Sequence, residues 1–191
     1  MTDDANPGQD ETGLTDSGLT DSGLTDTGQA DRIAQFWDVA RPSAGRTSHG
    51  GAVGERSENV VPPPAWSFGD SPELADELLQ LVLDGVKSGT AAAVWEYEAA
   101  DEPLPRKGDL SIVLDGAGAP RLLIKTTQVD TVPFAEVTAE HAAAEGEGDR
   151  TLADWRDGHE RYWRRTLAQI GREFDPAMPV VCERFKVLFR S

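Results

Sequence analysis

The chain has 191 residues, with 34 Asp and Glu against 18 Lys and Arg and a formal net charge of −16. This charge disfavours a broad electrostatic contact with duplex DNA or an anionic membrane, although one local pocket can still be basic. Cys182 is the only cysteine, which excludes an intramolecular disulfide, and no apolar run approaches the ~18 residues of a membrane span. Together these features predict a soluble, cytoplasmic protein.

Residues 1–30 contain acidic side chains and no basic ones. A Ser/Thr-Gly-Leu-Thr-Asp pentad occurs at 12–16, 17–21 and 22–26. A five-residue period matches neither a helix nor a strand, and Gly, Ser, Thr and Asp favour turns. The segment also lacks aromatic and β-branched apolar residues, whose burial would offset the entropy of ordering. It is therefore predicted to be a disordered acidic tail.

Ordered structure is predicted to start at Asp31, whose side chain can cap a helix over 31–41. Apolar residues recur at helical spacing along that stretch: Ile33, Ala34, Phe36, Trp37 and Ala40. Pro42 is expected to end this helix, and 42–65, rich in Gly, Ser and Pro, is expected to be a linker loop. Residues 66–191 then form the core of a single domain that begins at Asp31.

A second helix is predicted to follow Asp70 or Ser71, with Pro72 in its first turn and Gly85 at its end. Its apolar stripe has the spacing of a face packed on a core: Leu74, Leu78, Leu81 and Val82. The other expected elements are strands over 91–97, 109–115, 121–129 and 180–189, the middle two forming a hairpin, and helices over 138–144 and 151–170. This pattern predicts a small α+β fold, with a β-barrel as one arrangement of its strands.

The turn Gly85-Val86-Lys87-Ser88-Gly89-Thr90 is the first stretch that can carry chemistry. Lys87 and Thr90 can direct an ammonium and a hydroxyl into one small space, where they would hold a phosphate, polarise a carbonyl or activate a hydroxyl. The turn is not a phosphate-binding P-loop, because in that loop the glycines precede the lysine and the hydroxyl follows it directly. The alternative interpretation is structural: a helix-ending glycine, a surface lysine and the start of a strand.

A second stretch, from His141 to Asp149, contains the acidic run Glu145-Gly146-Glu147-Gly148-Asp149. It is compatible with a metal loop, a fraying helix end or a catalytic carboxylate. The run does not guarantee the convergent oxygen ligands that a divalent metal prefers, so no metal or other cofactor is predicted.

Three further residues have both a structural and a functional interpretation. Trp155 and His159 share the aromatic face of the helix over 151–170, where rings either pack in a core or stack on a base. Glu183 lies among apolar residues on the last strand and needs either a partner or a role in the site. Arginines are frequent in this part of the chain, where they would face phosphates or pair with Asp157 and Glu160: Arg150, Arg156, Arg161, Arg164, Arg165 and Arg172.

Over about residues 31–190, an ordered series of short motifs in this chain resembles the ASCH domain family. The motifs are Trp66-Ser67-Phe68-Gly69-Asp70, Ala75-Asp76-Glu77-Leu78, the lysine turn, Leu104-Pro105 with Gly108-Asp109, Pro133-Phe134 to Val137, the acidic run, Trp155 with His159, and Val181-Cys182-Glu183-Arg184-Phe185. The resemblance implies a β-barrel related to the RNA-binding PUA domain, with the lysine motif in a cleft. It also implies RNA or modified-nucleoside chemistry, since small members remove the acetyl group of 4-acetylcytidine and others are described as ribonucleases.

The amidohydrolase members use a lysine, a threonine three residues later and a glutamate in the short helix after the hairpin. By resemblance these positions are Lys87, Thr90 and Glu145. We therefore expect a hydrolase of an acylated or modified pyrimidine nucleoside. Further residues expected to contact the substrate are Gly85, Gly89, Trp155, His159 and Glu183.

The roles within this trio stay open at the level of sequence. Amide hydrolysis needs a nucleophile, a base and positive charge near the oxyanion. Thr90 would attack or orient a water, Lys87 would act as base or stabilise the oxyanion, and Glu145 would hold the lysine or pass a proton to the leaving amine. The alternative functions are a non-catalytic module that binds single-stranded RNA, and a ribonuclease that uses the same cleft.

Overall fold

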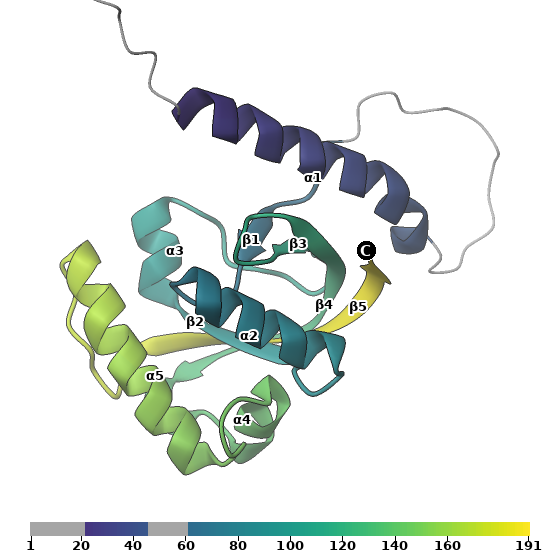
Figure 1. Ribbon diagram of the computed structural model, residues 1–191. Coiled ribbons are helices and arrows are strands. Elements are labelled where there is room, and N and C mark those ends of the chain that lie inside the picture. Colours follow the sequence, from purple (N-terminus) through teal and green to yellow (C-terminus); the bar gives the residue numbers. More distant parts are fainter. Residues whose placement is uncertain (1–21, 46–60) are drawn as a thin grey trace, which may run out of the picture.

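A computed structural model describes residues 22–45 and 61–191, and within them five strands form one curled sheet in the order β1-β3-β4-β5-β2 (Figure 1). The strands are β1 (Ala65–Ser67), β2 (Gly89–Ala93), β3 (Leu110–Leu114), β4 (Pro120–Pro133) and β5 (Pro179–Arg190). β1 pairs in parallel with β3, and the other pairs are antiparallel. The long β4–β5 pair shifts register between Leu123 and Ile124 and again between Thr126 and Gln128. Such irregularities bend a strand pair, which here gives the sheet its half-barrel form.

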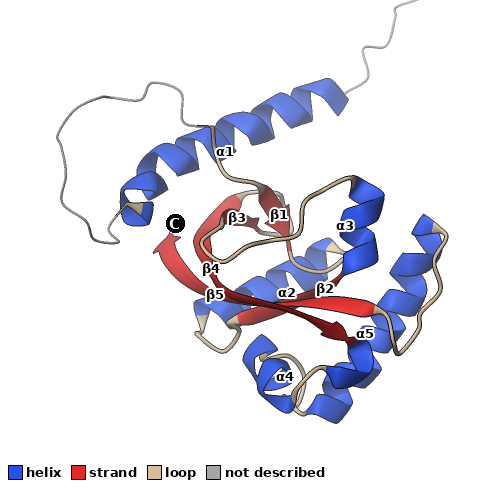
Figure 2. Ribbon diagram, turned by 180° about the vertical axis from the view of Figure 1, so that it is seen from behind, coloured by secondary structure: helices blue, strands red, loops and turns tan. Residues whose placement is uncertain are grey.

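Helices cover both ends of this sheet. They are α1 (Ser22–Ala44), α2 (Pro72–Leu83), α3 (Val94–Ala100), α4 (Ala139–Glu145) and α5 (Leu152–Thr166), with 3₁₀ turns η1 (Phe134–Glu136) and η2 (Leu167–Ile170). Figure 2 shows α1 across the end where β5 finishes, and α4 and α5 together at the opposite end. No helix in the described ranges is long and apolar enough to cross a membrane.

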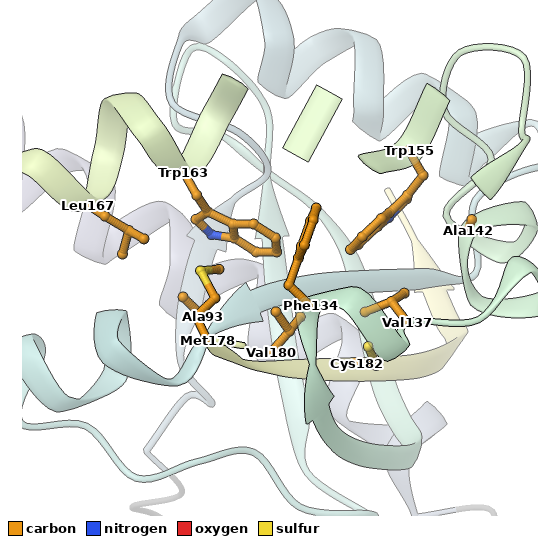
Figure 3. Packing of buried hydrophobic residues seen from close by; sticks show 10 residues of the cluster. All are labelled: Ala93, Phe134, Val137, Ala142, Trp155, Trp163, Leu167, Met178, Val180 and Cys182. Carbon is orange, nitrogen blue, oxygen red and sulfur yellow. The ribbon is translucent and has the colours of Figure 1, made fainter. Parts of the chain in front are cut away.

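Two hydrophobic clusters occupy the two faces of the sheet around β5. The first lies under α5 and contains Trp155, Trp163, Phe134 and Cys182 (Figure 3). The second lies under α2 and includes Phe185 of β5. Because successive residues of a strand point to opposite faces, Cys182 and Phe185 contribute to different clusters. A third cluster packs α1 on the sheet through Phe36, Trp37, Ala40, Ile112, Leu114 and Leu123.

The structure confirms the second helix, the hairpin, the short helix after Thr138 and the final strand. Ser71 caps α2 by accepting a hydrogen bond from the N–H of Leu74 at 3.2 Å, and Pro72 is its first residue. The strand predicted over 91–97 is wrong in its second half, because β2 ends at Ala93 and α3 follows. There the Glu96 carboxylate accepts a 2.7 Å hydrogen bond from the Ala93 N–H, which starts a helix instead.

Helix α1 extends beyond the predicted 31–41 at both ends. The side chain of Gln29 donates a 3.2 Å hydrogen bond to Gly118 O in the β3–β4 turn, a tertiary contact that a local pattern does not contain. Pro42 lies inside the last turn, where its missing N–H affects only the end of the helix. The boundary predicted between 30 and 31 therefore falls within a helix. The rest of the predicted tail, 1–21, and most of the predicted linker, 46–60, lie outside the described residues.

Candidate functional site

Lys87 lies in the tight connection between α2 and β2. Gly85 follows the helix with a φ of +75°, in the left-handed region that favours glycine. The N–H groups of Val86 and Lys87 both donate to Leu81 O, at 2.9 and 3.0 Å, so the chain turns back over the last helical turn. Lys87 is buried as a result, with 2% of the residue exposed.

Glu145 is the last residue of α4, and both ends of that helix fix its position. The Thr138 hydroxyl caps the helix by accepting a hydrogen bond from the N–H of His141 at 3.2 Å. Gly146 ends it with a φ of +72°, and a Cβ at this position would come within 2.8 Å of Val86. Glycine is therefore required where the end of α4 passes against the lysine turn.

The Lys87 ammonium lies between two carboxylates. Its Nζ is 2.6 Å from Oε1 of Glu147 and 3.3 Å from Oε2 of Glu145. Glu145 is only 1% exposed, whereas 31% of the Glu147 side chain is exposed, so Glu145 is the inner partner and Glu147 the outer one. The Phe68 ring lies on a third side, its centroid 5.2 Å from Nζ. The cation that these carboxylates hold is thus the lysine itself.

A buried carboxylate also needs hydrogen bonds for its remaining lone pairs, and Glu145 has them. Its Oε1 accepts from Trp155 Nε1 at 2.7 Å and from His141 Nε2 at 3.0 Å. Its Oε2, the oxygen bound to Lys87, also lies 3.7 Å from His159 Nε2. Burial by itself would raise the pKa of Glu145, but Lys87, His159 and His141 together hold that pKa well below its usual range.

Stacked rings hold these polar groups in place. The Trp155 ring stacks on His159 with centroids 4.1 Å apart, and on Phe134 with centroids 5.5 Å apart. Figure 3 shows Phe134 and Trp155 face to face within the cluster under α5. The indole N–H of Trp155 is therefore aimed at Glu145 by the packing of its own ring.

Thr90 and Glu183 face each other across the β2–β5 ladder, directly after the lysine turn. Opposite residues of an antiparallel pair share a face, and this is the face of Phe185. Glu183 Oε2 accepts a 3.1 Å hydrogen bond from Thr126 Oγ1. Burial raises the pKa of Glu183, against the opposing effect of that hydrogen bond. Among the described residues, none forms a hydrogen bond with the Thr90 hydroxyl.

The structure brings four of the predicted residues into one cluster: Lys87, Glu145, Trp155 and His159. Thr90 and Glu183 lie beside it on the sheet. Gly89 packs closely, since a Cβ there would lie 3.1 Å from Glu183 O, whereas a Cβ at Gly85 would meet nothing within 4 Å. Gly85 lies just after α2 with a left-handed backbone, and its role in the structure is to end that helix.

Three residues of the cluster were not assigned to the site from sequence. His141 and Glu145 are four residues apart on one helix, and this spacing could have identified His141. Glu147 lies in the acidic run that the sequence did single out. No sequence signal connects Phe68 with Lys87, because their contact depends on how α2 packs on the sheet.

The arginines of α5 are partly neutralised. Arg164 pairs with Glu160 at 2.7 Å, as predicted for residues four apart on a helix. Arg165 pairs with Asp70 at 2.6 Å, from outside the helix. These pairs reduce the positive charge that the surface of α5 offers to a phosphate backbone.

The half-barrel sheet, its flanking helices and the buried lysine define a PUA-like α+β domain of the ASCH type. The family model described as ASCH domain matches residues 64–189. The chain therefore belongs to the ASCH domain family, and the family and fold predicted from its motifs are confirmed. No curated protein sequence matches the chain significantly.

Two crystal structures are among the solved structures similar to this one. A crystal structure of a protein from Enterococcus faecalis V583 matches with a TM-score of 0.70 and 32% sequence identity, over 82% of this chain and 88% of that one. The crystal structure of an ASCH domain from Lactobacillus crispatus JV V101 matches with a TM-score of 0.64 and 24% identity, over 93% of this chain and 100% of that one. The second match, at its lower identity, supports the fold alone.

Proposed function

We propose that this protein is a hydrolase that cleaves the exocyclic amide of an acylated pyrimidine nucleoside of the 4-acetylcytidine type. The observation that carries the proposal is the ion pair of Lys87 and Glu145, which is almost fully buried. A buried ion pair is often no more stabilising than apolar residues of the same volume, so stability alone gives little reason for it. Charged groups desolvated in this way are typical of catalytic sites.

The chemistry follows from what each group can offer. Hydrolysis of an amide places negative charge on the carbonyl oxygen, and a desolvated ammonium is well suited to stabilise it. Glu147, the more exposed partner of Lys87, is the group that a substrate oxygen would replace. Thr90 would attack the acyl carbon or orient the attacking water. Glu183, on the same face as Thr90, would accept a hydrogen bond from the nucleoside.

A non-catalytic RNA-binding module has less support. Its surface would depend on the arginines of α5, and Arg164 and Arg165 already form ion pairs within the protein. Exposed pairs of this kind are weak, so they reduce the affinity for a phosphate backbone without abolishing it.

The test is incubation of the purified full chain with 4-acetylcytidine and chromatographic detection of cytidine. Lys87→Ala and Thr90→Ala are expected to lower kcat/KM by about 100-fold or more. Lys107→Ala, which changes an exposed loop lysine, is the matched control and should behave as wild type. Absence of cytidine with wild type, or full activity of Lys87→Ala, would contradict the proposal. Salt-dependent binding of single-stranded RNA without any product would favour the binding module instead.

A further inference from the structure

Glu183 of β5 is a carboxyl group without a counter-ion among the described residues. It is partly exposed, on the face of the sheet that also carries Phe185. Its hydrogen bond comes from a neutral group, the Thr126 hydroxyl, which donates to Oε2 at 3.1 Å. A partly buried carboxyl that has only a neutral donor can take up a proton at little cost.

The groups that face Glu183 favour this neutral form. Burial raises the pKa of Glu183, the hydrogen bond from Thr126 opposes the rise, and Asp109, which precedes β3, adds to it. Tyr97 of α3 stays a phenol, because burial and the charge of Glu183 raise its pKa. Lys87, in the turn before β2, is the cation on this side, and its ammonium is held by two other carboxylates.

The hydrogen bond from Thr126 makes the two oxygens of Glu183 different. Oε2 accepts from the hydroxyl, so in the neutral carboxyl it is the carbonyl oxygen, with a second lone pair for another donor. The proton then lies on Oε1. Glu183 therefore presents a donor directly beside an acceptor. This pair is complementary to a ring nitrogen with a lone pair that adjoins an exocyclic N–H.

We propose that Glu183 selects the substrate by pairing through both oxygens with this edge of a base. Oε1–H donates to the ring nitrogen, and Oε2 accepts from the N–H of the acylated exocyclic nitrogen. Enzymes that bind a single base commonly recognise this edge by hydrogen bonds. The inference rests on the proposed function and narrows its substrate class to bases in which the acylated nitrogen adjoins an unprotonated ring nitrogen, as in 4-acetylcytosine.

The register of the sheet connects this recognition with the reaction. Thr90 is directly opposite Glu183 on β2, and opposite residues have Cβ atoms about 4.5–5.5 Å apart. A base paired with Glu183 therefore has its exocyclic nitrogen beside Thr90. The acyl carbon is bonded to that same nitrogen. Glu183 thus positions the bond that is to be cleaved, and no proton has to leave the pair that it forms.

The first test is calorimetric binding to the full chain, with cytidine as a probe that has the same edge but no acyl group to lose. In 3-deazacytidine a C–H replaces the ring nitrogen, and its affinity should be about 10- to 100-fold lower. The affinity for cytidine should fall as the pH rises over about pH 5–9, by up to tenfold per unit, because the ionised carboxyl has no proton to donate. No binding of cytidine, equal affinities for the two probes, or an affinity independent of pH would overturn the recognition.

The second test separates recognition from a structural role. In Glu183→Gln the amide offers an N–H donor beside an oxygen acceptor and does not ionise. It should bind cytidine within about threefold of the wild type at low pH and keep that affinity as the pH rises. Glu183→Leu offers neither group and should bind about 10- to 100-fold more weakly. Glu173→Gln, at an exposed glutamate, is the control for net charge and should behave as wild type. Equal weakening by Gln and Leu would overturn the proposal.

These readouts do not require turnover, so the two proposals fail separately. Selective binding of cytidine without any release of acetate from 4-acetylcytidine would contradict the proposed function alone. Equal kcat/KM for 4-acetylcytidine and its 3-deaza analogue would overturn the recognition by Glu183 alone.

Discussion

The indole Nε1 of Trp155 donates a 2.7 Å hydrogen bond to Oε1 of Glu145. The two residues belong to different helices, so the bond joins α5 to the end of α4. The Trp155 ring lies in the hydrophobic cluster under α5 (Figure 3). Its N–H reaches Glu145, which forms the buried ion pair with Lys87. Core packing and the candidate site are therefore one unit.

Trp155→Phe keeps an aromatic ring and removes the donor to Glu145. Loss of a hydrogen bond to a buried charge is expected to lower the free energy of unfolding by about 1–3 kcal/mol beyond the cavity term. Trp163→Phe is the matched control, because it makes the same change in another buried tryptophan whose N–H reaches only the less buried Glu96, at 3.3 Å. Urea unfolding of both variants measures the difference. Equal losses would show that the hydrogen bond of Trp155 contributes nothing.

Lys87→Met leaves the buried Glu145 without its inner cation. This change is expected to cost about 3–5 kcal/mol of stability, because an uncompensated charge stays in the interior. The double variant with Glu145→Gln should recover part of that loss, and a double-mutant cycle by urea unfolding measures the coupling. Additivity within about 0.5 kcal/mol would contradict the ion pair seen in the structure.

The pKa of Glu145 is lowered in the folded protein, so its ionised form stabilises the fold. This contribution is complete above the usual carboxyl pKa of 4.5 and is lost as the pH falls below it. The stability difference between wild type and Glu145→Gln should therefore decrease by up to about 1.4 kcal/mol per pH unit on acidification. Urea unfolding between about pH 6 and the lowest pH at which wild type stays folded tests this. A difference that is independent of pH would refute it.

Glu147→Gln removes the negative charge of the outer partner of Lys87, and its neutral amide oxygen holds Nζ less strongly against a competing ligand oxygen. The affinity for an acylated nucleoside is expected to increase by about 3- to 10-fold, which corresponds to roughly 1 kcal/mol. Calorimetry or KM measures this change. Glu136→Gln, at an exposed glutamate, is the control for the change in net charge. Weaker binding by Glu147→Gln would mean that this carboxylate contacts the ligand instead of being replaced by it.

Gly146→Ala and Gly85→Ala make the same change at nearly the same backbone conformation, with φ of +72° and +75°. Left-handed backbone strain alone should cost about 1–2 kcal/mol in each. At Gly146 the new Cβ also meets Val86 at 2.8 Å, and the resulting shift of the lysine turn should cost about 1–3 kcal/mol more. Thermal unfolding compares the two, and equal stabilities would rule out the close contact between α4 and the turn.

Local patterns in the sequence determined several elements of this protein. Ser71 and Pro72 start α2, Thr138 starts α4 and Gly85 ends a helix, because capping and positive φ depend on only a few neighbouring residues. The order of the short motifs was sufficient to identify the ASCH family. Local patterns failed where a contact outweighed them, as at Ala93, where the Glu96 side chain turns an alternating stretch into a helix.

The tertiary structure alone decided what surrounds Lys87. Its carboxylate partner Glu145 is 58 residues away in the sequence, and spacing could suggest this pair only through family resemblance. The outer position of Glu147, the contact with Phe68 and the shared oxygen between Lys87 and His159 follow from how α2, α4 and α5 pack on one sheet. Burial and ion pairing arise from contacts between distant segments. The sequence could therefore point to Lys87, but only the fold shows the groups that surround its ammonium.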